Sequence, residues 1–181
     1  MELDDVVPEP DHVTRQARWI AAEPRAVWDA LHAVRFSGLP LTLVLSAARF
    51  LPVLLSGRGR RQVHDRPFLD ALPVPLLESQ PPSSVVFGGL LQPWRLTGHE
   101  PAPQLDAAAL RAWDAPGWVV VAMDFRLVPT RGGTELSSET RVRATDDAGR
   151  AAFARYWRVI RHGSTAVRWE VLTAVELRAT G

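Results

Sequence analysis

The sequence predicts an α+β fold in which an antiparallel sheet packs against one long C-terminal helix. The helix is expected over residues 146–179, where apolar side chains recur at spacings of three and four and therefore share one face. This apolar stripe consists of Phe153, Trp157, Ile160, Val167, Val171 and Ala174. The clearest strand is expected over 118–129, where apolar and polar side chains alternate. A stripe of this length has to be buried, and the preceding strands can cover it.

Length and composition indicate one globular domain. The chain has 181 residues, of which 46% are hydrophobic and 23% charged, which is ordinary for a protein with a sizeable core. We expect a flexible tail over residues 1–12, which contain Pro8, Pro10 and several acids, and a single domain over 13–181. The acidic start lacks an apolar segment, which argues against a secretory signal, so a cytoplasmic location is expected.

Charge and residue usage exclude several functions. The formal net charge is +1 and the basic residues are spread along the chain, so no nucleic-acid partner is expected. All basic residues are arginines, which removes Schiff-base chemistry through lysine. The chain has no cysteine and its five histidines are scattered, so neither a metal site nor a cofactor is predicted.

The first half of the chain begins with a strand and two helices. A β-branched and aromatic run predicts a strand over 13–22, and Pro24 opens a short amphipathic helix over 24–34. The apolar stretch 39–55 is interrupted by two prolines and Arg49, so it predicts a second helix without stable membrane insertion. A basic loop follows over 56–67, where His64 and Asp65 are adjacent.

A meander of short strands is expected next, over 74–78, 84–91 and 94–99. Gly88 and Gly89 interrupt the second of these strands, as glycines do at a bulge or where another group approaches the backbone. A short helix is expected over 105–113.

The strand over 118–129 is expected to return through a glycine turn as a strand over 134–144. Thr145, Asp146 and Asp147 can then cap the last helix. Inside that helix, Gly163 indicates either a kink or close packing against a neighbour.

Charged side chains share one face of the last two strands. If these strands pair as a hairpin, Asp124, Arg126, Glu139 and Arg141 become cross-strand neighbours. This face is either an exterior cluster of ion pairs or, if a bulge reverses the register, part of a cavity. In the second case Glu139 would be a buried carboxylate that anchors a polar ligand group or acts as a general base.

Two stretches carry a resemblance to a known family. Residues 20–31 end a strand in a small-residue turn and begin a helix with Pro24 and Trp28; residues 139–142 and 153–164 add a second matching run. These stretches resemble the START-like (SRPBCC, polyketide cyclase) superfamily, in a bacterial branch. The resemblance implies a helix-grip fold: a curved antiparallel sheet of six to seven strands around a long C-terminal helix, two short helices after the first strand, and an internal cavity.

The superfamily includes carriers, aromatase/cyclases, oxygenase domains and co-chaperone-like binders, so the fold alone does not determine the function. We expect binding of a hydrophobic or amphipathic small molecule, lipid-like or polyketide-like, without established catalysis. An aromatase/cyclase acting on a polyketide-like substrate is one alternative. The other is a structural or partner-binding module whose cavity is filled by its own side chains. The oligomeric state is not indicated.

The expected ligand-binding residues come mainly from the inward faces of the last helix and the sheet, and no catalytic residue is assigned. Aromatic and methionine side chains at these positions are suited to a pocket for a flat apolar ligand, although they also suit a plain core. The set is Trp157, Tyr156, Ile160, Phe153, Met123, Phe125, Phe87 and Trp94, with Glu139 and Arg141 as polar candidates.

Overall fold

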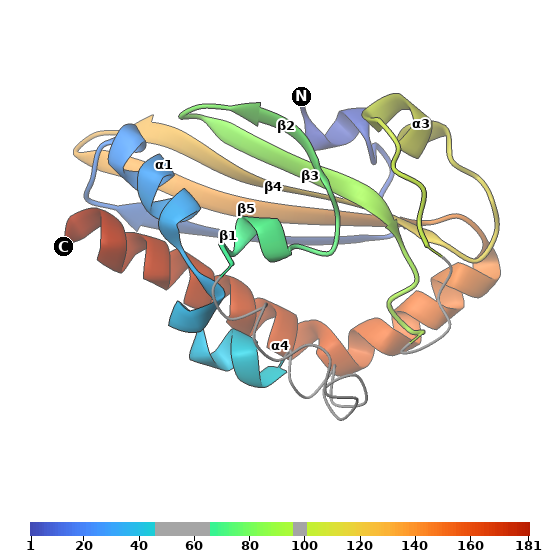
Figure 1. The fold of residues 1–181 in the computed structure, drawn as a ribbon. Helices are drawn as coiled ribbons and strands as arrows, with labels where there is room; N and C mark the ends of the chain where they lie inside the picture. The colour runs from blue at the N-terminus through green and yellow to red at the C-terminus, as the bar shows by residue number, and fades with distance from the viewer. Residues whose placement is uncertain (46–65, 96–100) are drawn as a thin grey trace. The chain divides into compact units, whose positions relative to one another are not determined.

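The computed structural model describes residues 1–45, 66–95 and 101–181, and these form an α+β fold (Figure 1). Its order of elements is η1 (Leu3–Asp5), β1 (His12–Ile20), α1 (Pro24–Ala33), η2 (Phe36–Gly38), η3 (Leu69–Ala71), β2 (Leu76–Gln80), β3 (Ser84–Leu91), α3 (Ala107–Ala112), β4 (Val119–Thr130), β5 (Gly133–Ala144) and α4 (Asp147–Thr180). A strand, a helix, further strands and one long C-terminal helix are the elements of the helix-grip architecture, so the predicted fold class is confirmed.

The sheet has five strands in the order β1-β5-β4-β3-β2, and β3 pairs antiparallel with both β2 and β4. The prediction of six to seven strands was therefore too high for the described part of the chain. The strand expected over 94–99 is the one that differs. Trp94 lies in a turn, and residues 96–99 lie outside the described residues.

Helix α1 confirms the first predicted helix. Pro24 occupies its first turn, where its missing N–H leaves no hydrogen bond unmade. Val27, Trp28 and Leu31 are buried, so the predicted apolar face is the packed face. Of the second predicted helix, residues 40–45 are helical. The remainder of that stretch and residues 56–65 of the basic loop, including His64 and Asp65, lie outside the described residues.

The two glycines of β3 lie where other groups approach the strand closely. The register between β2 and β3 shifts between Leu76 and Glu78, so Leu77 is an extra residue in β2. A Cβ on Gly88 would lie 2.6 Å from Cδ1 of Leu77, and one on Gly89 would lie 3.1 Å from Cδ of Pro75. The close approach predicted at the two glycines is confirmed, whereas the bulge lies in β2, and Gly88 and Gly89 pair in regular register with Ala122 and Val121 of β4.

The chain divides into two compact units. Unit 1 consists of Met1–Ala17, Val74–Arg126 and Ser137–Arg161, and unit 2 of Arg18–Pro73, Leu127–Leu136 and His162–Gly181. Several elements contribute to both units. The single domain expected over 13–181 therefore stays a prediction, and each unit is described by itself.

In unit 1, the first residues of the chain pack onto the sheet. Leu3 is 4% exposed, and Val6 and Val7 are fully buried. Together with α3 they cover an apolar cluster on β3 and β4 that includes Val86, Leu90, Val120 and Ala122. The sequence suggested a flexible tail over 1–12 because acids and prolines stand beside these three apolar residues, which are spaced for a single helical turn.

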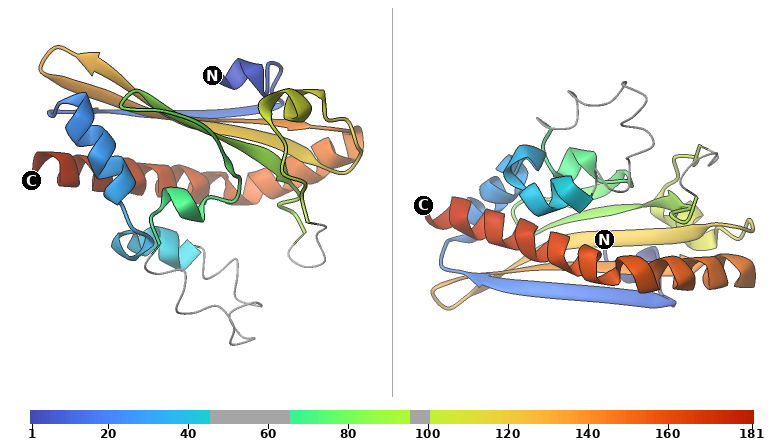
Figure 2. Two further views of the ribbon diagram at one scale, coloured as in Figure 1. Left: turned by 45° about the horizontal axis from the view of Figure 1, so that its top comes forward. Right: turned by 90° about the horizontal axis from the view of Figure 1, so that it is seen from below.

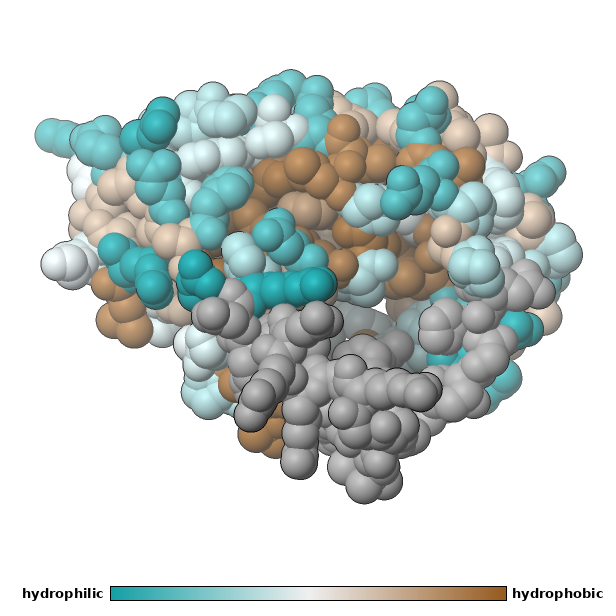
Figure 3. All heavy atoms as spheres, viewed as in Figure 1, coloured by the Kyte–Doolittle hydropathy of each residue, from teal (hydrophilic) through white to brown (hydrophobic). Residues whose placement is uncertain are grey.

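Two layers thus cover the strands of unit 1. Figures 1 and 2 show η1 and α3 on one side of β3 and β4, and the N-terminal half of α4 on the other side. Figure 3 shows hydrophobic side chains gathered over β2 and β3 and beside α3, where Leu77, Leu105 and Trp113 are partly buried against the apolar cluster.

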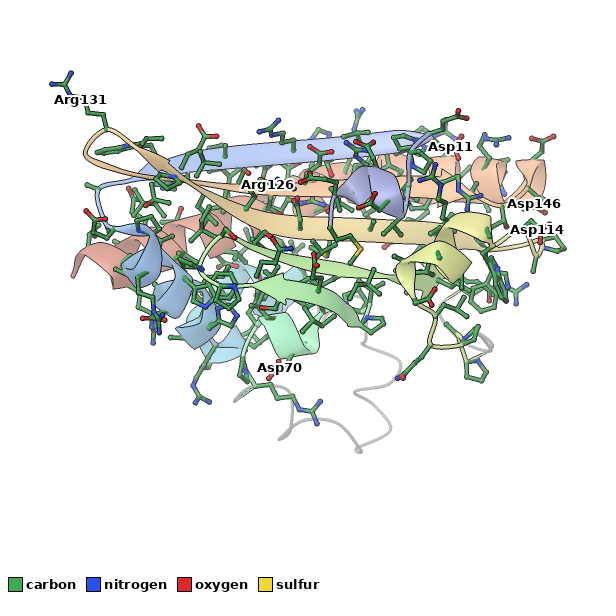
Figure 4. The ribbon with its side chains drawn as sticks, turned by 90° about the horizontal axis from the view of Figure 1, so that it is seen from above. Asp11, Asp70, Asp114, Arg126, Arg131 and Asp146 are labelled. Carbon is green, nitrogen blue, oxygen red and sulfur yellow. The ribbon has the colours of Figure 1, made fainter. Side chains whose placement is uncertain are left out.

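The first turn of α4 is capped as predicted. The Asp146 side chain accepts hydrogen bonds from the backbone N–H groups of Gly149, at 2.8 Å, and Gly117, at 3.2 Å. Asp146 therefore both starts the helix and ties it to the loop before β4. Asp11 lies at the same end of unit 1 in Figure 4, where it accepts from the backbone N–H of Ala144 and from Arg150.

In unit 2, polar contacts hold the C-terminal half of α4. Arg18 of β1 donates to Glu176 at 2.6 Å and to Thr173 at 3.1 Å. Glu170 accepts hydrogen bonds from the backbone N–H groups of Leu41 and Thr42, at 2.7 and 2.8 Å. The first N–H groups of a helix have no partner within that helix, and a carboxylate placed at its start can accept them. Glu170 of α4 does this for the helical residues 40–45 and so anchors them to α4.

Gly163 of α4 also lies in unit 2, next to Leu45, and the packing there leaves room for a methyl group. A Cβ at this position would lie 3.4 Å from Cδ1 of Leu45, which is ordinary van der Waals contact. Gly163→Ala is therefore expected to raise the free energy of unfolding by about 1 kcal/mol, because alanine is the better helix former. Urea denaturation followed by circular dichroism measures this change.

Gly88→Ala is the matched comparison in a strand. The added methyl group would force the end of the Leu77 side chain to move, so this variant is expected to be less stable than wild type, in contrast to Gly163→Ala. Equal effects of the two alanines would contradict the packing described for both glycines.

Candidate functional site

An aromatic cluster lies in the first turns of α4. The rings of Phe153 and Trp157 are stacked, with centroids 6.0 Å apart and planes 13° apart. Tyr156 lies 6.0 Å from Phe153, and His12 of β1 lies 5.0 Å from the same ring. Helical spacing of three and four residues brings the three α4 rings together.

The burial of the α4 side chains varies along the helix. Phe153 is buried near its start, and Val171, Leu172 and Val175 are buried near its end. No residue from 154 to 170 is buried, although this stretch carries the predicted apolar stripe. Tyr156, Trp157 and Ile160 in particular are only half-buried, so large apolar side chains remain accessible in the middle of the helix.

The sheet residues predicted for the site share one face of β3 and β4. Phe87 pairs with Met123, and Val85 pairs with Phe125, so these side chains point the same way. Phe87 and Phe125 are buried, whereas Met123 is half-buried. We call this the inner face. Trp94, the eighth apolar candidate, is half-buried in a turn after β3 and is not part of a strand.

The opposite face, here called the outer face, carries a polar pocket of about 200 Å³. Its walls come from the N-terminal segment (residues 1–7) and from β1, β4 and β5; the lining residues are Glu2, Leu3, Asp4, Arg15, Asp124, Arg126, Ser137, Glu139 and Arg141. Figure 4 looks onto this face and shows Arg126 on β4 beside η1. The four charged residues predicted as cross-strand neighbours thus do come together.

Two arginines connect the strands to the N-terminal segment. Arg126 forms a two-pronged contact with Glu2, at 3.0 and 2.6 Å, and lies 3.6 Å from Asp124. Arg141 donates to Glu139 at 2.7 Å and also binds Asp4. Each guanidinium therefore bridges one carboxylate of the sheet and one of the segment.

Asp124 is the most buried acid of the outer face. Its residue is 5% exposed, and its Oδ1 accepts the backbone N–H of Glu139 at 3.1 Å. Burial raises the pKa of this carboxyl because it disfavours the charged form. The hydrogen bond from Glu139 and the charge of Arg126 oppose the rise in pKa but do not cancel it.

Strand alternation separates the aromatic cluster from the polar pocket. His12 contacts α4, whereas Arg15, three positions along β1, lines the pocket and so points to the other side. Glu139 and Arg141 therefore do not share a face with Trp157. The alternation of side chains along β5 is kept, and Leu136 is fully buried. Glu139 and Arg141 therefore match the exterior cluster of ion pairs, the first of the two alternatives.

Sequence reasoning missed His12, Arg15, Ser137 and the acids of the N-terminal segment. Alternation along β1 could have assigned His12 and Arg15 to opposite faces. Glu2 and Asp4 gave no signal, because nothing in a short acidic stretch indicates which arginines it will meet.

No family model matches the chain, and no curated protein matches it. The solved structures similar to it include a Mesorhizobium loti protein, with 14% identity, 91% of this chain and 97% of that chain covered, and a TM-score of 0.43. A Chromobacterium violaceum protein has 16% identity, coverages of 91% and 97%, and a TM-score of 0.37. The Zhui aromatase/cyclase of a Streptomyces species has 16% identity, coverages of 94% and 96%, and a TM-score of 0.34. These values assign no activity to the chain.

Within residues 1–45, 66–95 and 101–181, no group of three or more His, Asp and Glu side chains is arranged to hold a metal ion. No helix in the same ranges combines the length and hydropathy of a membrane span.

The raised pKa of Asp124 gives a testable pH dependence. Between the unfolded-state value of about 3.9 and the higher folded-state value, the folded protein binds more protons than the unfolded chain. Stability contributed by this group therefore falls as pH rises through that window. Asp124→Asn is expected to remove this fall, because an amide oxygen can still accept the Glu139 N–H.

The measurement is the free energy of unfolding of wild type and Asp124→Asn from pH 3 to pH 7. All other titrating groups are shared, so the difference reports on Asp124. The variant should gain stability relative to wild type as pH rises, and a relative loss would contradict the assigned cause.

Proposed function

We propose that the protein binds a hydrophobic or amphipathic small molecule, lipid-like or polyketide-like, at the inner face of unit 1. The observation that carries the proposal is that Tyr156, Trp157 and Ile160 are half-buried, whereas Phe153 before them and Val171, Leu172 and Val175 after them are buried. An apolar ligand laid against these side chains would remove their remaining surface from water, at roughly 25 cal/mol per Å² of apolar area.

A polar group on the same face supports an amphipathic ligand. Ser138 is fully buried, and its hydroxyl has no hydrogen-bond partner among the described residues. Its neighbours Ser137 and Glu139 line the outer pocket, so alternation directs Ser138 to the inner face. A buried hydroxyl without a partner costs about 1–3 kcal/mol, and a polar ligand atom could relieve that cost.

Binding without catalysis is the form of the proposal that the geometry supports best. The aromatase/cyclase alternative would need an acid or base beside the aromatic cluster. Glu139, the carboxylate considered for that role, lies in the outer pocket with Arg141. His12, which can act as a base, does contact Phe153 and Trp157, so the alternative loses only its carboxylate.

Trp157→Ala tests the proposed binding surface. Loss of this ring is expected to weaken binding of a fluorescent fatty acid by roughly ten- to a hundredfold, the equivalent of about 1.5–3 kcal/mol of lost apolar contact. Trp169→Ala is the matched control, because Trp169 is 45% exposed and packs over Arg18 in unit 2. It should leave the dissociation constant unchanged.

The single tyrosine of the chain provides a second readout. Fluorotyrosine labelling gives one ¹⁹F resonance, from Tyr156, which should shift as the fatty acid is added. Equal affinity of wild type and Trp157→Ala together with an unmoved resonance would overturn the proposal.

A further inference from the structure

The outer pocket contains an uneven set of charges. Four carboxyl groups and three guanidinium groups line it. Arg126 and Arg141 are each engaged by two of the carboxylates. All four acids thus have an arginine contact, but each ionised carboxylate can accept about four hydrogen bonds. Acceptor sites therefore remain on these acids.

Two donors in the same pocket are unused. Neither the Arg15 guanidinium nor the Ser137 hydroxyl makes a hydrogen bond or ion pair with any residue that the structure describes. Arg15 is exposed to solvent, so the absence of a described partner for its guanidinium does not by itself indicate a ligand site. Ser137, however, is only 5% exposed as a residue and lines the pocket, so it is a polar group of the sheet itself at this site.

These groups are complementary to a ligand with both charges. Arg15 and Ser137 offer donors suited to a carboxylate. A simple anion, however, would also meet the surplus negative charge of Glu2, Asp4, Asp124 and Glu139. An ammonium group next to the carboxylate would use that surplus and the spare acceptor sites. The charge pattern thus favours a zwitterion over either an anion or a cation.

The size of the pocket restricts the ligand further. About 200 Å³ is room for a molecule of amino-acid size, and Leu3 is the one apolar residue in the lining. We propose that the outer pocket binds a small α-amino acid or a similar zwitterion, with its carboxylate on Arg15 and Ser137 and its ammonium group among the carboxylates. This site is independent of the apolar ligand proposed for the inner face.

The test compares a zwitterion, which carries a carboxylate and an ammonium group, with two molecules that each carry only one of these groups. The wild-type protein is titrated with alanine, propionate and isopropylamine, and amide shifts are followed by NMR. Alanine should bind with a dissociation constant of about 1 mM or below, with shifts at Ser137 and Glu139, and each half-molecule at least tenfold more weakly. Propionate binding as tightly as alanine, or no binding of alanine, would overturn the proposal.

Variants then assign the contacts. Arg15→Ala and Ser137→Ala should each weaken alanine binding at least fivefold. Arg25→Ala, which removes an exposed guanidinium of α1 paired with Asp29, should leave it unchanged. Alanine binding that survives Arg15→Ala would contradict the proposed carboxylate contact. Arg15→Ala should keep wild-type affinity for the fatty acid, so failure at this site is distinguishable from failure at the inner face.

Discussion

On the outer face of unit 1, two arginines connect the N-terminal segment to the sheet. Arg126 and Arg141 each sit between a carboxylate of the sheet and a carboxylate of the N-terminal segment. Exposed ion pairs contribute little by themselves, but these pairs flank Leu3, which is buried in the apolar cluster. The ion pairs therefore fix the position of a segment whose stabilising contribution is apolar. Without that segment, Val86, Val120 and Ala122 would lose cover.

The two faces of the sheet are consequently different kinds of surface. The outer face combines a covered apolar cluster with a polar pocket in which most charges are paired. The inner face is apolar, and α4 leaves its own aromatic side chains half-buried there. Charged residues on the outer face do not have to be desolvated when an apolar molecule binds on the other side. A sheet built this way can keep its ion pairs and its proposed apolar ligand surface apart.

Sequence patterns predicted the elements much better than the contacts between distant segments. Periodicity gave α4, β4 and β5, and the glycine pair of β3 correctly indicated a close approach of neighbouring groups, because these signals are local. The alternation of polar and apolar residues also predicted that Glu139 and Arg141 lie beside Asp124 and Arg126. The docking of Leu3 could not be predicted, since the neighbouring Glu2 pairs with Arg126, 124 residues further along the chain. Ser137 and Ser138 were missed because a serine in a strand looks the same whether or not its hydroxyl has a partner.

The two methionines of the chain report separately on the two faces. Met1 packs against the apolar cluster of the outer face, whereas Met123 pairs with Phe87 on the inner face. With ¹³C-methyl methionine, the protein should therefore show two methyl resonances that can be followed during titration with decanoic acid. The account predicts that the Met123 resonance shifts and the Met1 resonance does not. A shift of Met1 with Met123 unmoved would contradict it.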